Sequence, residues 1–498
     1  MTPLATEESK SRTSTDNIAA IAGRGTIYIT AAKIWFMVSG YGIAVTLTYL
    51  LSEENYGLYR VVINTVSIIN AVIVTGTYQT VSSYVSQEPE NAGAIKRKAL
   101  GLQVYIGGAA ALGFFLLAPV TASLLNDPRL TGWLRLASLI TLAYSFYSVF
   151  TGYFNGKRLF GIQAGLDITY STLKLAFIVL LAWLGFGVTG SVGGFALAAV
   201  SVLVISTMIA GEDNHKGEAR AGQLFKFQSY VLLFTFVLTL LQRVDLMLIK
   251  ALSSQDATIA SKNAGYYSAA MDIANLTYQI IVSVTFVIFP LVSQSTFAED
   301  RRRTQSYISN TLRYALMVMA LSATLFSSTA GGVLRLIYRE NYQAGTSALR
   351  ILAFGMLFFG LLYVITTIIS ASGQPRVSLL LGLATLALSA ALNAVLIPLH
   401  GLAGAATATT VSMMAGTLVG CLYLWKSFRA VMSILSLARI MACAGAVYTG
   451  SLLFASQSKL LLIGQLIALS VAYVITLVVT GELGREDLRL IARVVRPR

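Results

Sequence analysis

Charged residues interrupt several long apolar stretches of the sequence. The segment LLQRVDLMLIK holds Arg243 and Asp245 two residues apart, and Lys33 and Lys174 lie inside similar apolar runs. A guanidinium or ammonium group in such a place is costly unless it has a partner, and arginine binds phosphate oxygens through two parallel hydrogen bonds. These cations therefore suggest the binding of an anionic group such as a phosphate.

Arg243 and Asp245 need different partners. On one helix, residues two apart point about 160° away from each other and do not pair. We expect Arg243 to face a polar cavity and Asp245 to contact another helix. The alternatives are that Lys33 reaches the membrane surface, that Lys174 pairs with Asp167, and that Arg243 satisfies a carbonyl or carboxylate.

Three further stretches carry polar residues in steps of three and four, which places them on one face of a helix. Such faces line a wet cavity or hold helices together by hydrogen bonds. The stripes are Arg60, Asn64, Ser67, Ala71, Thr75, Tyr78 and Ser82; Ser268, Asp272, Asn275, Gln279 and Ser283; and Gln163, Asp167, Tyr170 and Lys174.

Roles follow from the residue types in these stripes. Arg60 joins the three cations named above as a candidate substrate-binding residue, and Asp167 and Asp272 either carry a coupling H⁺ or Na⁺ or neutralise nearby cations. Arg135 and Arg350 lie near the outer starts of two helices, as an outer gate or a frame for the lobes. The expected neutral cavity lining is Asn64, Ser67, Asn275 and Gln279.

The elements that must position these residues are membrane-spanning helices. Hydrophobic residues make up 56% of the chain and charged residues only 11%. About 20 apolar residues cross a bilayer at ~1.5 Å per residue, so the long runs predict an all-α polytopic membrane protein. The fourteen predicted spans are 23–50, 57–86, 99–124, 133–155, 160–184, 187–210, 224–251, 265–296, 309–337, 344–372, 376–398, 401–425, 432–455 and 459–480.

Lysine and arginine gather in alternate loops, for example KRK at 96–98 and RRR at 301–303. This bias predicts that both termini, 1–22 and 481–498, are cytoplasmic. The net charge of +15 reflects the same bias and attraction to anionic membrane lipids, so we expect no nucleic-acid partner.

Catalytic and metal chemistry have little support in the sequence. Cys421 and Cys443 fall within predicted spans, and His215 and His400 have no ligand partners at metal-site spacing. No nucleophile elbow, phosphate loop or dinucleotide motif occurs in a convincing context. We therefore expect no enzyme, metal or cofactor.

An internal repeat organises the chain. YVSQ after Gly57 returns as LVSQ after Gly265, and GVTG at 187–190 returns as GLAG at 401–404. We expect two parallel six-helix lobes, 23–211 and 221–427, in pseudo-twofold repeat around a central cavity, followed by two helices within 432–480. That architecture is typical of alternating-access transport.

The repeat, together with the segments RVDLMLIKALSS, NAGYYSAA, FPLVSQ and ASGQPR, resembles the polysaccharide-transport branch of the multidrug/oligosaccharidyl-lipid/polysaccharide flippase superfamily. This branch contains the Wzx-type O-antigen and exopolysaccharide flippases. The resemblance implies inversion of an undecaprenyl-diphosphate-linked glycan across a bacterial inner membrane, for lipopolysaccharide or other polysaccharide biosynthesis.

Three alternatives stay open at this point. A lipid II flippase would share the helix count and the basic cavity. A multidrug antiporter would share the superfamily, although its ligands are cationic. A membrane glycan polymerase or ligase is the enzymatic alternative.

Overall fold

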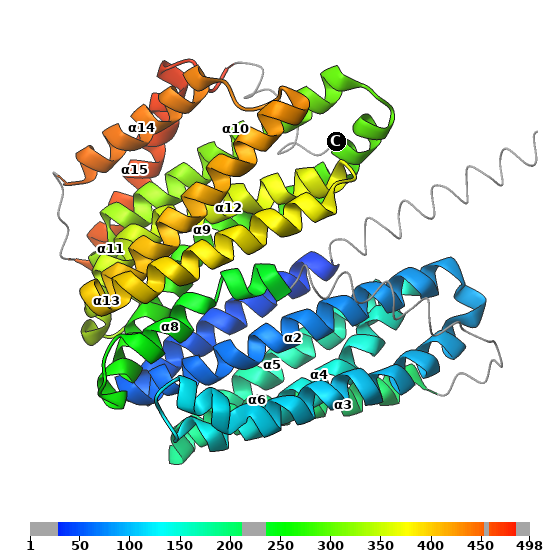
Figure 1. Ribbon diagram of the computed structural model, residues 1–498. Helices are drawn as coiled ribbons and strands as arrows, with labels where there is room; N and C mark the ends of the chain where they lie inside the picture. Colours follow the sequence, from blue (N-terminus) through cyan, green and yellow to red (C-terminus); the bar gives the residue numbers. More distant parts are fainter. Residues whose placement is uncertain (1–27, 212–235, 453–457, 485–498) are drawn as a thin grey trace, which may run out of the picture. The chain divides into compact units, whose positions relative to one another are not determined.

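The computed structural model describes residues 28–211, 236–452 and 458–484, which form helices and no strand (Figure 1). The predicted cytoplasmic tails, His215 and the first part of the span 224–251 lie wholly or largely outside the described residues. The chain divides into two compact units, Met1–Thr239 and Leu240–Arg498.

In the first unit, α4 is the central helix. It packs against α2, α3 and α6, and α5 packs against α6. Leu134, Ala137 and Ile140 are fully buried at steps of three along α4, which is the pattern of a core-facing helix. The elements are the helix Tyr28–Leu50, α2 (Glu53–Gln87), η1 (Pro89–Asn91), α3 (Ala92–Leu124), α4 (Leu130–Gly156), α5 (Phe160–Leu181), η2 (Ala182–Phe186) and α6 (Gly187–Ala210).

In the second unit, α12 has the central place. It packs against α9, α10 and α13, and Leu352, Met356 and Phe359 are buried along it. A helical segment at 236–241 precedes the labelled elements. These are α8 (Val244–Leu252), α9 (Ala257–Phe297), α10 (Arg301–Ser328), α11 (Ala330–Ile337), η3 (Glu340–Gly345), α12 (Thr346–Ala371), α13 (Pro375–Phe428), α14 (Ile434–Leu452) and α15 (Lys459–Val479).

Two long helical stretches are hairpins that reverse at a glycine. Gly187, between α5 and α6, has φ 56° and ψ −133°, and Gly401, inside α13, has φ 55° and ψ −128°. A side chain disfavours such positive φ, whereas glycine adopts it readily. Thr385 and Gly416, at nearly equal distances from Gly401 along the chain, are in close contact. The repeated GVTG and GLAG sequences thus begin with the same backbone turn.

The described residues contain ten helices long and apolar enough to cross a membrane. Two of them are the hairpins, of 51 and 54 residues, and each is long enough for two crossings at ~1.5 Å per residue. Of the remaining predicted spans, α9 has 41 residues, and α8 belongs to the span 224–251. The predicted all-α polytopic fold is confirmed.

The predicted limits of the span 309–337 are wrong. The helix α10 begins at Arg301, because the Asp300 side chain accepts a hydrogen bond from the Arg303 N–H and caps it. It ends at Ser328, and α11 continues as a separate helix.

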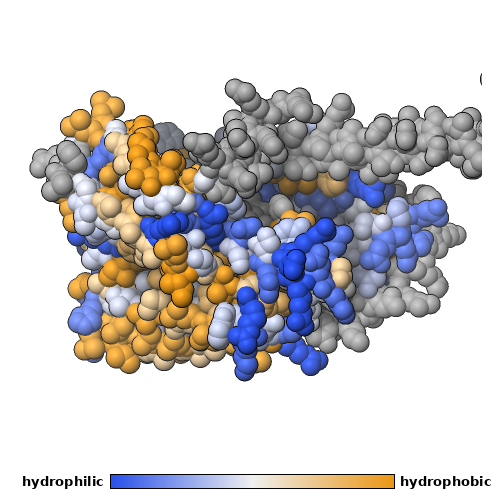
Figure 2. Space-filling model, turned by 90° about the horizontal axis from the view of Figure 1, so that it is seen from above, coloured by the Kyte–Doolittle hydropathy of each residue, from blue (hydrophilic) through white to orange (hydrophobic). Residues whose placement is uncertain are grey.

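Apolar side chains cover wide areas of the surface, shown in orange beside blue polar residues (Figure 2). On α14 and α15, Ile434 and Leu460 are about four-fifths exposed, at 83% and 80%. Exposed apolar area of this extent is expected where lipid chains replace water.

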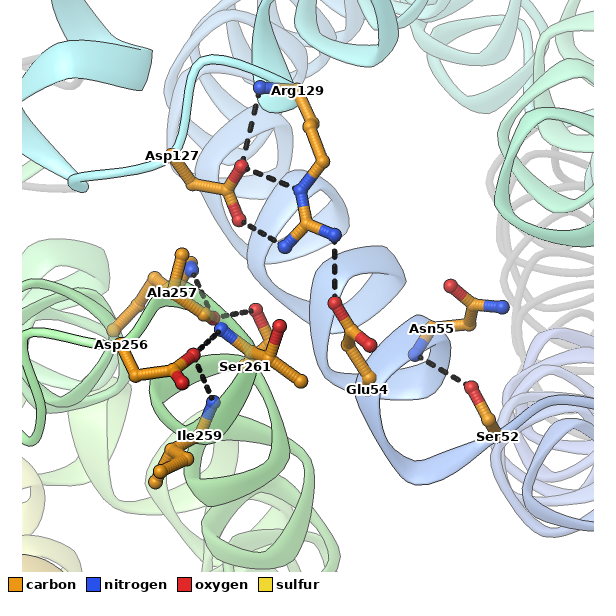
Figure 3. Close-up of polar contacts among 11 residues, drawn as sticks. Ser52, Glu54, Asn55, Asp127, Arg129, Asp256, Ala257, Ile259 and Ser261 are labelled. Carbon is orange, nitrogen blue, oxygen red and sulfur yellow. Dashed lines mark hydrogen bonds and ion pairs between the residues drawn. The ribbon is translucent and has the colours of Figure 1, made fainter.

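Ion pairs tie one end of the first unit together. Arg129 donates through its Nε and Nη2 to the buried Asp127, both at 2.9 Å, and through its Nη1 to Glu54 at 2.7 Å (Figure 3). Hydrogen bonds raise the pKa of Arg129: the bond to Asp127 contributes most, and the bond to Glu54 contributes next. The turn between α3 and α4 is thereby fastened to the first turn of α2.

In the second unit, Asp256 caps α9 by accepting hydrogen bonds from the N–H groups of Thr258 and Ile259 at 2.7 and 3.3 Å (Figure 3). Such caps satisfy donors that the first helical turn leaves without intrahelical partners. The start of α9 is thus fixed where α8 ends.

We expect Gly187→Ala and Gly401→Ala each to destabilise the protein by about 1–2 kcal/mol, because alanine disfavours the backbone conformation of both turns. The measurement is the midpoint temperature of unfolding in detergent. Gly445→Ala in α14 is the control, since no atom lies within 4 Å of the added Cβ and no positive φ is involved. Midpoints equal to the control's would contradict the role of the two turns.

Candidate functional site

In the first unit, α5 places Asp167 against two other helices. The Tyr147 hydroxyl of α4 donates to Asp167 Oδ1 at 3.0 Å. Lys33, on the helix Tyr28–Leu50, is close enough to Asp167 to interact with it electrostatically. Two of the predicted site residues are therefore brought together.

Lys174, two turns further along α5, lies among aromatic rings. Its Nζ is 4.1 Å from the ring centroid of Phe195, 5.8 Å from that of Phe36 and 5.9 Å from that of Tyr170. Tyr144 packs edge-on against Tyr170, with centroids 5.3 Å apart. Cation–π attraction holds an ammonium group here.

These aromatic residues were not among the predicted site residues, apart from Tyr170 in the α5 stripe. They come from different helices, so no single stretch of sequence shows them as a group. The only local signal is the pair Tyr144 and Tyr147, three residues apart on α4.

A neutral hydrogen-bond network continues from the same face of α5. Gln163 Oε1 accepts from Asn155 Nδ2 at 2.8 Å, and Ser82 Oγ donates to Asn155 Oδ1 at 2.7 Å. Tyr78 also bonds to Gln163. These four residues come from α2, α4 and α5, so the structure shows here the interhelical hydrogen bonds that the polar stripes allow.

In the second unit, the helix that carries Arg243 is broken. Helical structure ends at Leu241, Gln242 and Arg243 form a turn, and α8 begins at Val244. The prediction of one continuous span over 224–251 is therefore wrong at Gln242 and Arg243. Arg243 is the N-cap residue of α8 and has backbone angles φ −129° and ψ −11°.

Aromatic residues of α9 and α12 lie beside this break. The Tyr278 hydroxyl donates to Gln242 Oε1 at 3.5 Å, and Tyr278 and Arg243 interact electrostatically. The Phe359 ring packs edge-on against Tyr278, with centroids 5.0 Å apart. The half-buried Arg243 is thus placed next to a tyrosine, as Lys174 is in the first unit.

Asp245 contacts two other helices, as predicted. It is 1% exposed, and its Oδ2 accepts from the hydroxyls of Tyr267 in α9 at 2.7 Å and Thr409 in α13 at 3.3 Å. Its Oδ1 accepts from the Leu246 N–H at 2.8 Å. These bonds stabilise the carboxylate within the second unit.

The other candidates occupy varied places. Arg135 and Arg350 are exposed, and the Arg135 guanidinium carbon lies 5.1 Å from the Phe115 ring centroid. Arg60 is half-buried, with its guanidinium carbon 5.9 Å from the Tyr56 ring centroid. Asn64 is buried, whereas Ser67, Asp272, Asn275 and Gln279 are half-buried.

The sequence matches a known family over more than half of its length. The model of the family described as "Polysaccharide biosynthesis protein" matches residues 22–296. A protein of Haloferax volcanii named "Probable low-salt glycan biosynthesis flippase Agl15" is 24% identical over 169 residues, 33% of this chain and 35% of that protein. The chain spans about a third of the length of the curated relatives it matches.

Solved structures share the fold. The lipid II flippase MurJ in an inward closed conformation superposes with a TM-score of 0.75 at 14% identity, covering 92% of this chain and 99% of that one. An inward-facing multidrug-resistance transporter of the MATE family, in the MOP superfamily, gives 0.64 at 14% identity, covering 82% and 95%. This similarity concerns the fold.

Asp245→Asn should destabilise the protein by about 2 kcal/mol, because one carboxylate oxygen becomes an NH₂ group that faces hydrogen-bond donors. The readout is the amount of folded protein in membranes and its midpoint of thermal unfolding. Asp300→Asn is the matched control, since the Asp300 side chain is 39% exposed. Equal midpoints for the two variants would show that the Asp245 contacts contribute little.

Proposed function

We propose that the protein is a flippase for a lipid-linked glycan, because the chain belongs to the polysaccharide biosynthesis protein family. The similarity to a probable glycan flippase and the fold shared with a lipid II flippase support this function. Family and fold are those of transporters, which disfavours the polymerase and ligase alternative.

The proposed substrate is an oligosaccharide carried on undecaprenyl diphosphate. The protein would move it from the cytoplasmic to the outer leaflet of a bacterial inner membrane, for O-antigen or exopolysaccharide synthesis. A diphosphate and its sugars cannot cross hydrocarbon unaided, because buried polar groups and charges without partners cost several kcal/mol each. Alternating access of the lobes 23–211 and 221–427 would remove that barrier.

The observation that carries the proposal is the helix break at Arg243. A helix N-terminus has free N–H groups and a partial positive charge, which favour an anion. Here the N-terminus of α8 coincides with a guanidinium group on its N-cap residue. Interrupted transmembrane helices bind anionic substrate groups in this way in other transporters. We assign the diphosphate to this place.

Lys33, Lys174 and Arg60 are proposed as further substrate contacts. Lys174 lies over aromatic rings, and its positive charge would attract a phosphate group. Lys33 interacts with Asp167, so a substrate anion would compete for it. Arg135 and Arg350 remain the proposed outer gate.

Two sources of driving force are compatible with the site. An outward-moving anion gains about 2.3 kcal/mol per charge and 100 mV of inside-negative potential. Alternatively, Asp167 or Asp272 would carry H⁺ or Na⁺ in the opposite direction. Measuring transport in vesicles with each gradient imposed separately distinguishes these mechanisms.

Transport of lipid II is the second candidate function, because MurJ shares the fold over 99% of its own length. Purified protein in vesicles separates the two candidates when lipid II and a diphosphate-linked oligosaccharide are offered side by side. Protection of the sugar from an externally added modifying reagent reports which substrate crosses.

For the proposed diphosphate contact, Arg243→Ala should abolish surface-glycan export at an unchanged protein level. Arg243→Lys should keep part of the activity, because it retains the charge and loses the two-pronged donor geometry. Lys33→Ala and Lys174→Ala should reduce export less. The assay is complementation of a flippase-deficient strain, with the membrane-protein level measured in parallel.

Arg301→Ala is the control, because this exposed arginine lies at the start of α10 and belongs to neither candidate cluster. It should export normally. Full export by Arg243→Ala at normal expression would remove Arg243 from the substrate path and leave it as a helix-packing residue.

A further inference from the structure

The helices α14 and α15 follow the second repeat, and the sequence pattern indicates no role for them. They belong to the second unit and pack against α10. Both expose apolar side chains over much of their surfaces. Besides buried apolar side chains such as Ile440 and Leu469, polar contacts hold them to the rest of the unit.

One face of α10 supplies the first of these contacts. Gln305 Nε2 donates to the Phe428 carbonyl at 2.9 Å, and Ser309 Oγ donates to the Val431 carbonyl at 3.1 Å. Gln305 and Ser309 are four residues apart, so they lie one above the other on the helix. They fasten the end of α13 and the linker that leads to α14.

The next residue on this face, Arg313, binds the end of α15. Its Nε donates to Glu482 Oε1 at 2.7 Å, and its Nη2 donates to the Glu482 carbonyl. Arg439 of α14 places its Nη1 3.7 Å from Glu482 Oε2. Glu482 is 1% exposed, so one buried carboxylate joins α10, α14 and the end of α15.

The local backbone explains how Glu482 reaches this position. Gly481 has φ +71°, which lets the chain turn at the end of α15, and the Glu482 N–H closes the turn on the Leu477 carbonyl at 3.0 Å. One turn beyond Arg313, the Met317 carbonyl accepts from the Tyr473 hydroxyl at 3.1 Å. Four successive turns of α10 thus contact the end of α13, the linker after it, and the end and middle of α15.

We infer that one face of α10, formed by Gln305, Ser309, Arg313 and Met317, is the docking surface for the helices α14 and α15. Arg313 and Glu482 are positioning residues that make α14 and α15 move with the second unit. This inference rests on the proposed transport function. Removing one partner of a buried ion pair leaves the other charge buried without compensation, so the pair is sensitive to single substitutions.

Hydrogen–deuterium exchange on the purified full-length protein tests the docking directly. Arg313→Ala should accelerate amide exchange in 434–452 and 459–479 by at least about tenfold and leave α12 unchanged. The control is Arg303→Ala on the same helix, because its side chain is 75% exposed and pairs only locally with Asp300 at 3.1 Å. It should leave the exchange unchanged.

Surface-glycan export at a matched protein level tests the positioning role. It should fall by at least about fivefold in Arg313→Ala, as the exchange rises. Arg313→Lys retains the charge and should lie between wild type and Arg313→Ala in both measurements. Glu482→Gln, which keeps the side-chain shape, serves as the milder variant if Arg313→Ala does not fold.

The outcomes separate the two proposals. Unchanged amide exchange in Arg313→Ala or Glu482→Gln overturns the inferred docking surface on α10. Faster exchange with full export overturns the positioning role. A wild-type protein that exports no glycan overturns the proposed function instead. The exchange data still decide whether the docking surface of α10 holds α14 and α15.

Discussion

The structure depends on one constraint: hydrocarbon offers no hydrogen-bond partner, so polar groups within the spans must be satisfied by the protein. Lys250 is one example. Its side chain is fully buried, and its ammonium group donates to the Ala257 carbonyl at 3.0 Å, at the start of the next helix. Asp245 is held by donors from α9, from α13 and from its own backbone. Lys250 and Asp245 therefore help to join the helices of the second unit.

The cations at the two candidate sites are held differently. Lys174 lies over aromatic rings, and Arg243 is the N-cap of a helix beside Tyr278. Rings attract a cation through their quadrupole and take up none of its protons in strong hydrogen bonds. In the first unit the positive charge thus lies over aromatic rings, and in the second unit it lies at the start of a helix.

The sequence predicted the features that depend on length and local pattern. Long apolar runs indicated the spans, and the GVTG and GLAG repeats indicated two turns that the structure shows with nearly the same backbone angles. It did not predict the break at Gln242 and Arg243, because neither glycine nor proline marks it. The aromatic group around Lys174 was missed because its rings come from several helices. Glu482 follows the last apolar run and reads as part of a polar tail, although the turn at Gly481 buries it.

The shared fold does not select a substrate, because lipid II and multidrug transporters both superpose on this chain at 14% identity. The choice rests on which charges are already satisfied inside each unit. A cationic drug would need a carboxylate, yet Asp245 accepts hydrogen bonds from three donors, and Asp167 accepts one from Tyr147 and interacts with Lys33. Using either acid for a drug would disrupt contacts between helices. Arg243 adds its charge to the positive end of α8, and the Asp245 carboxylate in the first turn of this helix accepts a hydrogen bond from the Leu246 N–H. The proposal of a lipid-linked glycan rather than a cationic drug therefore rests on the family match and on the interhelical contacts of Asp167 and Asp245.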